Sequence, residues 1–478
     1  MGNDEIALIS DPSHAFKAIR NNFQNYGIFY MDQYYVELNE LETNEINFDV
    51  FSKIVAFCME RELSVASHLD EDLLKKSKGH FKKMDVGIAQ KLFSPDTVSS
   101  LEYLMEHYPD RFPSYYKTTK LFIAKVARWW EIMKSRTVSF CFHSDSSKTQ
   151  SEHHKIWKKN YQELKKFIIF IGSIKTHDRH KKLNDFQKAS ILGTTSVLWL
   201  ADKLVKTDGF KFFLPGRVLN DTIENFFSQI RQFNKNPSAL MFHRFAKALA
   251  VTQYLKYSPS GSYGEDDAEN FFLDLNDFYH NEVQKDFNEE LEDVESLETD
   301  EDVIVIEKED YDPNDFAEDC ALAHIAGYVL KKTVGSVKSK CDTCVKVLLV
   351  PEKEDKQEVN ALIKAKSFKE EKLGFPSILA NKMFKSAELV FRQKRIELLK
   401  ENKNIGPTIL EDVLRDFETE FSDIPVCHLR LIFGRFIRIR CHFWAKRSNR
   451  VLIASQEGEI EAHANSSASL KQVQVTHN

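Results

Sequence analysis

Two cysteines separated by two residues give this sequence its clearest candidate for metal chemistry. Cys341 and Cys344 have a spacing with which proteins bind zinc, and a second ligand pair can come from Cys427-His428 or from Cys441-His442. Thiolate and imidazole ligands arranged as a tetrahedron form a closed, structural zinc site. The alternative is that these cysteines are ordinary buried thiols, because a long stretch of chain separates Cys344 from either second pair.

Two acidic patterns indicate where helices begin. Asp11 precedes Pro12, and Asp is a good N-cap while Pro suits the first helical turn. Asp221 and Glu224 have the spacing of a capping box, in which the glutamate reaches back to the backbone of the N-cap residue. On local grounds alone, helix capping explains both patterns without a metal ion.

The composition describes a large globular chain built mainly from helices. Of its 478 residues, 29% are charged and 42% hydrophobic, and there are only 16 Gly and 12 Pro to form tight turns. Periodicity and capping signals predict helices at 11–23, 48–61, 71–82, 86–108, 118–134, 154–171, 221–233, 237–257, 322–332, 358–367, 380–400, 409–420 and 428–446, with short strands at 5–10 and 210–214.

The formal net charge of −6 is the sum of an acidic segment and a basic remainder. Residues 265–319 contain 24 Asp or Glu and two Lys, whereas the rest of the chain carries 64 basic and 48 acidic residues. Self-repulsion makes the acidic segment a solvated linker. The basic runs Lys175–Lys182 and Arg435–Arg450 alternate charge with aromatic residues, which is typical of a DNA-facing surface or of ordinary solvated helix faces.

The cysteine count and the apolar runs indicate the compartment. Seven cysteines, an odd number spread over a long chain, favour a reducing compartment rather than a disulfide framework. The chain begins without a secretory signal, and its apolar runs are too short to span a bilayer. We therefore expect a protein of the cytosol or nucleus with no membrane partner.

Three segments, in order, resemble the motifs of P-element-type DNA transposases, a family that includes the THAP-domain-containing transposases. Asp11–Asn22 (DPSHAFKAIRNN) is similar to D-P-P-H-x-x-K-x-x-R-N, Met84–Ser94 (MDVGIAQKLFS) to M-x-V-x-x-A-x-x-x-x-S, and Arg217–Arg231 (RVLNDTIENFFSQIR) to R-L-N-Q-D-x-L-E-N-F-F-x-x-I-R. Asn236-Pro237 and Ala326–Val329 add to the resemblance, which covers roughly residues 5–345.

The resemblance implies an RNase-H-like catalytic core interrupted by a helical insertion that binds GTP. In the family's DDE scheme, three carboxylates hold two Mg²⁺ (or Mn²⁺) ions, which activate the attacking hydroxyl group and steady the leaving oxygen. Asp11 matches the second catalytic aspartate and Glu224 the glutamate, so both are the implied catalytic and metal-binding residues. The family places the first aspartate on an upstream strand, and only ten residues precede Asp11, so we expect the chain to be inactive and truncated at its N-terminus.

The resemblance also implies a set of GTP-binding residues. Val86 and Ser94 match positions of the second motif, and Asp221 matches an aspartate that contacts the nucleotide. Glu131, in the run WEIMKSR, stands where the family's F-D-x-L-N-S-R run has aspartate. Asp85 is a second departure, because a basic residue is common at that position and an added carboxylate beside a triphosphate is unfavourable.

We therefore expect a mainly α chain with a partial α/β RNase-H-like core. The expected domains are a partial core at 1–36, the insertion at 37–206, a core segment carrying Glu224 at 207–258, the acidic linker at 259–320, a helical C-terminal domain at 321–453 and a disordered tail at 454–478. The function implied is that of a transposase or transposase-derived nuclear protein that binds DNA at transposon ends and forms homo-oligomers. The alternative is a domesticated, catalytically dead adaptor or repressor that binds DNA or a partner protein.

Overall fold

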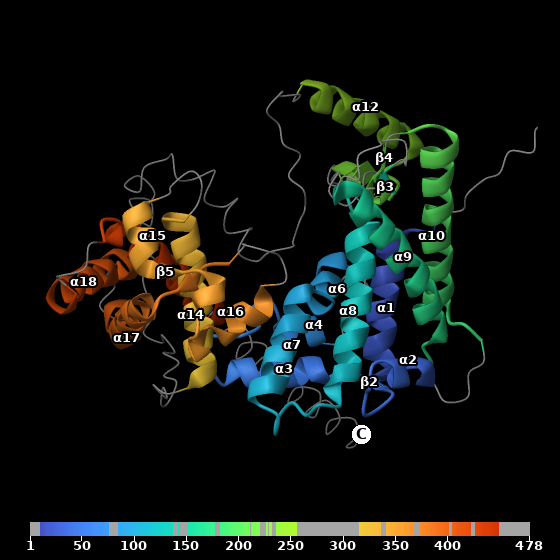
Figure 1. Cartoon of the computed structure of the whole chain (residues 1–478). Helices are drawn as coiled ribbons and strands as arrows, with labels where there is room; N and C mark the ends of the chain where they lie inside the picture. Colours follow the sequence, from blue (N-terminus) through green and yellow to red (C-terminus); the bar gives the residue numbers. More distant parts are fainter. Residues whose placement is uncertain are drawn as a thin grey trace, which may run out of the picture. The chain divides into compact units, whose positions relative to one another are not determined.

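The computed structural model (Figure 1) is built mainly of helices, as the sequence predicts. It divides into two compact units: unit 1 is Met1–Phe57 with Ala66–Lys285, and unit 2 is Cys58–Val65 with Asp286–Asn478. Among the described residues, no helix is long and apolar enough to cross a membrane. The described residues are 10–75, 85–136, 142–143, 152–176, 182–210, 212–219, 226–227, 229–231, 236–255, 315–335, 341–367, 373–400, 404–421 and 426–448.

Unit 1 is a helical body with two short antiparallel strand pairs in its described part. The strands are β1 (Ile28–Tyr30) with β2 (Glu45–Asn47), and β3 (Phe142–His143) with β4 (Phe212–Phe213). β4 confirms the strand expected at 210–214. Residues 5–9 of the other expected strand lie outside the described residues, and the RNase-H-like core stays a prediction. The helices are α1 (Pro12–Tyr26), α2 (Gln33–Leu38), α3 (Asp49–Met59), α4 (Glu71–Leu74), α6 (Val86–Leu92), α7 (Pro95–His107), α8 (Tyr116–Met133), α9 (Glu152–Ser173), α10 (Asp185–Asp202) and α12 (Ala239–Leu255).

Helix α1, which carries the first of the three motifs, supplies much of the core of unit 1. It packs against α6, α8 and α10. Phe16, Ile19 and Phe23 follow one another at helical spacing and are fully buried. Phe16 stacks on Trp130 of α8 with ring centroids 4.4 Å apart. Aromatic burial of this kind supplies a large share of the apolar area of a helical body.

The single helix predicted at 86–108 is wrong, because the structure has two helices there. α6 ends at Leu92, and α7 begins at Pro95 with Ser94 as its N-cap. Proline lacks a backbone N–H and disfavours helical geometry in the residue before it, so it ends one helix and opens the next. The Ser94 hydroxyl accepts a hydrogen bond from the backbone N–H of Thr97 at 3.1 Å.

Unit 2 is also helical, and two of its segments approach so closely that only glycine fits. A Cβ atom on Gly327 of α14 would lie 2.1 Å from the carbonyl oxygen of Gly374, which explains the glycine of the Ala326–Val329 motif. Strand β5 (Leu349–Val350) pairs with β6 (Phe375–Pro376). The helices are α14 (Phe316–Thr333), α15 (Asp342–Leu348), α16 (Ala361–Lys366), α17 (Ile378–Lys400), α18 (Ile405–Glu420) and a last helix at 429–448.

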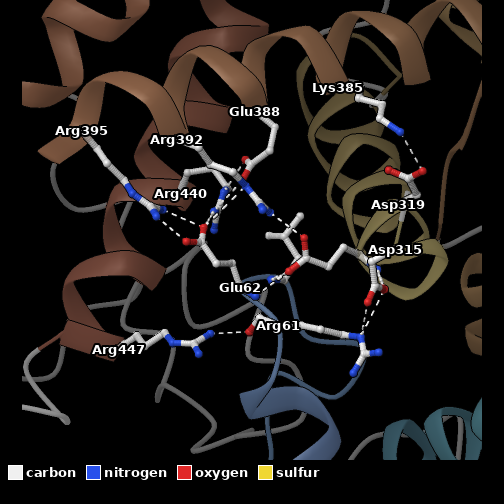
Figure 2. A network of polar contacts seen from close by, with 12 residues as sticks. Arg61, Glu62, Asp315, Asp319, Lys385, Glu388, Arg392, Arg395, Arg440 and Arg447 are labelled. Carbon is white, nitrogen blue, oxygen red and sulfur yellow. Dashed lines mark hydrogen bonds and ion pairs between the residues drawn. The ribbon is translucent and has the colours of Figure 1, made fainter. Parts of the chain in front are cut away.

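A network of buried charges lies in the core of unit 2 (Figure 2). Glu388 of α17 is 1% exposed and accepts hydrogen bonds from Arg440 Nε at 2.6 Å and Nη2 at 2.7 Å. Arg392, one turn along α17, donates to the same carboxylate through Nε at 2.6 Å. We call this group, with the residues that extend it below, the Glu388 network.

The Glu388 network also binds residues 58–65 to the rest of unit 2. Glu62 accepts a hydrogen bond from Arg395 Nη1 at 2.7 Å. Glu318 of α14 accepts from the backbone N–H of Glu62 at 2.6 Å and from Arg392 Nη2 at 3.0 Å. Burial alone would raise the pKa of Glu62, but the hydrogen bond and charge of Arg395, with two further arginines, hold that pKa at about 2.

Two more arginines complete the attachment of residues 58–65. Arg61 Nε lies 2.9 Å from a carboxylate oxygen of Asp315, the N-cap of α14. Arg447, near the end of helix 429–448, donates to the backbone oxygen of Met59 at 2.7 Å and to that of Arg61. Segments from three distant parts of the sequence therefore meet through charge.

We predict that Glu388→Gln lowers the free energy of unfolding of unit 2 by about 3 kcal/mol or more, because removing one member of a buried ion cluster leaves arginine charge uncompensated. Chemical denaturation followed by far-UV circular dichroism measures the loss. Glu411→Gln is the matched control, since Glu411 binds Arg430 through two hydrogen bonds of 2.7 and 3.0 Å at an exposed position. Equal effects of the two substitutions would contradict the prediction.

Candidate functional site

The four residues of the predicted zinc site come together in unit 2. The side-chain ligand atoms of Cys341, Cys344, Cys427 and His428 all lie within 4.8 Å of one another. Cys427 Sγ is 3.5 Å from Cys341 Sγ and 3.6 Å from Cys344 Sγ. His428 Nδ1 is 3.6 Å from Cys344 Sγ and 3.1 Å from Cys427 Sγ. We call these residues the Cys₃His cluster.

Two helix starts position the Cys₃His cluster. Cys341 is the N-cap residue of α15, Cys344 lies in the first turn of that helix, and Cys427 and His428 directly precede helix 429–448. This confirms the first of the two ligand pairs that the sequence offered. Cys441, from the second pair, lies 13 residues beyond His428, which is about 20 Å of helical rise and beyond the reach of the cluster.

The cysteines of the cluster differ in environment. Cys344 is buried, Cys341 is partly exposed and Cys427 is exposed. Burial raises the pKa of the Cys344 thiol to about 11. A hydrogen bond from the backbone N–H of Cys344, together with one from Cys427, lowers the pKa of Cys341. The prediction of ordinary buried thiols fits only one of the three cysteines.

Asp11, the implied catalytic aspartate, caps α1. One of its carboxylate oxygens accepts a hydrogen bond from Ser13 N at 2.9 Å, and the other lies 2.8 Å from His14 Nδ1. The Asp11 side chain is only 6% exposed. Glu224 and Asp221 lie outside the described residues, and their role with Asp11 stays a prediction.

Two residues of the expected GTP set lie where α6 and α7 begin. Val86 is the first residue of α6, and Ser94 is the N-cap of α7. Ser94 Oγ donates to the backbone oxygen of Lys91 at 3.2 Å and also lies 3.0 Å from Thr97 Oγ1. The serine hydroxyl therefore has a structural role in this chain.

Glu131, the third described member of the set, lies near the end of α8. Its carboxylate binds Arg128 Nη1 at 3.0 Å, and Arg128 also donates to Asn160 of α9 at 2.6 Å. Glu131 thus belongs to a polar chain that joins α8 to α9. The sequence did not indicate this role, because Asn160 is remote along the chain.

The first and second motifs lie side by side, since α1 packs on α6. Arg20 of the first motif is 3% exposed, and its charge interacts with that of Asp85. Burial lowers the pKa of Arg20, and the Asp85 carboxylate acts in the opposite direction. Asp85, which the sequence marked as unfavourable beside a triphosphate, therefore compensates a buried arginine and caps α6.

The start of the third motif packs against the WEIMKSR run. Gly216, one residue before that motif, donates its backbone N–H to Ser135 O at 2.9 Å. A Cβ atom at Gly216 would lie 2.2 Å from the backbone oxygen of Lys134. The motifs did not point to Gly216, although the Pro215-Gly216 pair is a recognisable turn signal.

The basic runs divide between the fold and the surface. In the run Arg435–Arg450, Arg440 is 1% exposed and belongs to the Glu388 network. Arg447 donates hydrogen bonds to the backbone oxygens of residues 59 and 61. Arg438, in contrast, is exposed. In the run Lys175–Lys182, the backbone of Lys175 pairs with that of Tyr30, and residues 177–181 lie outside the described part.

Two family models match separate parts of the chain. One, described as "TNP-like, GTP-binding insertion domain", matches residues 13–145, and the other, "DNA transposase THAP9, C-terminal domain", matches residues 312–444. Together they cover more than half of the sequence and define a transposase-related protein. Both matches support a P-element-type transposase, as the motifs predict.

A comparison with solved structures finds the Drosophila P element transposase strand transfer complex, with a TM-score of 0.40 and 18% sequence identity. The match covers 52% of this chain and 52% of that one, so the chain spans about half the length of this relative. Curated proteins give no match.

We predict that Gly216→Ala lowers the thermal midpoint of unit 1 by several degrees, because the new methyl group would overlap the backbone oxygen of Lys134. Differential scanning calorimetry of the full chain measures the shift. Gly406→Ala is the control, since nothing lies within 4 Å of the corresponding Cβ position. An unchanged midpoint in Gly216→Ala would contradict the prediction, because the backbones at Gly216 and Lys134 would then move apart without loss of stability.

Proposed function

We propose that the chain is a DNA-handling protein of transposase descent whose unit 1 binds guanine nucleotide. The observation that carries the proposal is the match of residues 13–145 to a GTP-binding insertion domain. The structure supports it, because the first two motifs lie within one helical body around α1. The nuclear location, the DNA partner and the oligomeric state that the resemblance implies belong to the same proposal.

Asp221 is the residue that we propose for recognition of the guanine base. Guanine presents two donors, N1–H and the 2-amino group, to a carboxylate, whereas adenine has an acceptor at N1. A carboxylate at this position therefore favours GTP over ATP, because ATP leaves it unpaired. Ser94→Ala is a poor test of nucleotide binding, since it also removes the cap of α7.

We predict saturable binding of GTP to the full chain, with ATP at least tenfold weaker, in isothermal titration calorimetry. Asp221→Ala should weaken GTP binding by about tenfold or more, which is roughly 1.4 kcal/mol. Asp208→Ala, at an exposed position of the same unit, is the matched control and should bind GTP like the unchanged chain. No heat at millimolar GTP, or equal affinities for GTP and ATP, would remove this part of the proposal.

A second candidate function, a non-catalytic adaptor or repressor, is favoured by the contacts of Asp11. Both of its carboxylate oxygens are engaged within α1, by Ser13 N and by His14. Capping α1 and contacting His14 give this carboxylate a role that needs no metal ion. We propose that Asp11 contributes to stability in this chain and that the protein acts by binding DNA or a partner protein.

We predict that the purified chain does not cleave labelled duplex DNA in the presence of Mg²⁺ or Mn²⁺. Asp11→Ala should lower the free energy of unfolding by about 1 kcal/mol, as the loss of a helix cap does, and should leave DNA binding in a gel-shift assay unchanged. Metal-dependent cleavage that disappears in Glu224→Gln would establish the catalytic function and exclude the adaptor.

A further inference from the structure

We propose that Cys341, Cys344, Cys427 and His428 bind one Zn²⁺ ion as a closed structural site, and that this ion joins α15 to the start of helix 429–448. The site is independent of nucleotide binding and of strand cleavage. It uses residues of unit 2 alone, and all four lie within the region matched by the C-terminal domain model.

The spacing of the ligand atoms fits tetrahedral zinc. Zn–S bonds of about 2.3 Å and Zn–N bonds of about 2.0 Å place two sulfurs about 3.8 Å apart and a sulfur and a nitrogen about 3.5 Å apart. The two sulfur pairs at 3.5 and 3.6 Å, and the sulfur–nitrogen pairs at 3.6 and 3.1 Å, lie close to these values. Four protein ligands fill a tetrahedron and leave no position for water, which is the pattern of a structural site.

A disulfide bond and the packing of free thiols both fit the cluster less well than a metal ion does. A disulfide needs a bond of about 2.05 Å, and Cys427 Sγ is nearly equidistant from Cys341 and Cys344, at 3.5 and 3.6 Å. Packing of thiols in an apolar core does not explain the cluster either, because Cys427 is exposed and Cys341 is partly exposed.

Backbone hydrogen bonds hold Cys341 in place within the cluster. Backbone N–H groups of Cys344 and Thr343 form hydrogen bonds to Cys341 Sγ. Such N–H···S bonds fix the position of a zinc ligand. Cys341 is further anchored to α14, because its backbone N–H donates to Val334 O at 2.9 Å.

The choice of metal follows from the ligands. Three thiols and one imidazole are soft or borderline donors, which suit Zn²⁺ and not Mg²⁺ or Ca²⁺. In each pair the two ligands are near neighbours in the sequence, but Cys427 lies 86 positions after Cys341. A bound ion would therefore fix a long-range contact that no helix pattern specifies.

The test is the zinc content of the purified full chain, measured by inductively coupled plasma mass spectrometry. We expect about one zinc per chain, as for any closed four-ligand site, and a loss of most of it in Cys344→Ser and in Cys427→Ser. Cys441→Ser is the matched control, because Cys441 lies outside the cluster but in the helix that directly follows the second ligand pair. It should keep its zinc.

A second measurement covers the case in which a cysteine variant fails to fold. The unchanged chain is reconstituted with Co²⁺, and tetrahedral thiolate coordination should give intense visible d–d bands and near-ultraviolet charge-transfer bands that His428→Ala alters. Four results would each overturn the proposal: less than about half a metal ion bound per chain after reconstitution with Zn²⁺ or Co²⁺, octahedral cobalt spectra, equal zinc loss in Cys441→Ser, or a Cys341–Cys427 disulfide found by mass spectrometry.

Discussion

The core of unit 2 depends on the neutralisation of charge away from water. Moving a single guanidinium or carboxylate into a protein interior costs several kcal/mol, and the cost is recovered only where opposite charges and hydrogen bonds surround it. Glu388, 1% exposed, meets this condition with Arg440 and Arg392. Removing one member leaves the others uncompensated, so a stable unit 2 needs all of the segments that carry them.

This constraint explains why unit 2 is not one stretch of sequence. The matched C-terminal domain covers residues 312–444, yet residues 58–65 pack in the same unit and supply Glu62. The Glu62 carboxylate accepts a hydrogen bond from Arg395, and the Glu62 backbone N–H donates one to Glu318. The segment therefore pairs with both a positive and a negative group of the core. Without it, the buried Arg395 would face the interior with one carboxylate fewer.

The sequence predicted much of what local patterns determine, with two local signals overlooked, and missed what depends on remote partners. Helix periodicity placed most of the described helices. The Cys-x-x-Cys spacing identified one half of the Cys₃His cluster and left a choice of two pairs for the other half. The Pro95 break was missed because apolar periodicity continues across it. We did not predict α10 from the sequence, although Asn184 and Gln187 form a capping box at its start. The Glu62 contacts, to residues more than 250 positions away, have no local signal.

The same limit applies to charge as a guide to function. The basic excess outside residues 265–319 suggested DNA-facing surfaces, and the run Arg435–Arg450 was one candidate. In the structure, Arg440 faces Glu388 and Arg447 holds the backbone of residues 59 and 61, so both are committed to the fold. Net charge records how many basic groups exceed the acidic ones but not where they lie. A phosphate-binding surface on this helix therefore has to be built from its outward positions, such as Arg438.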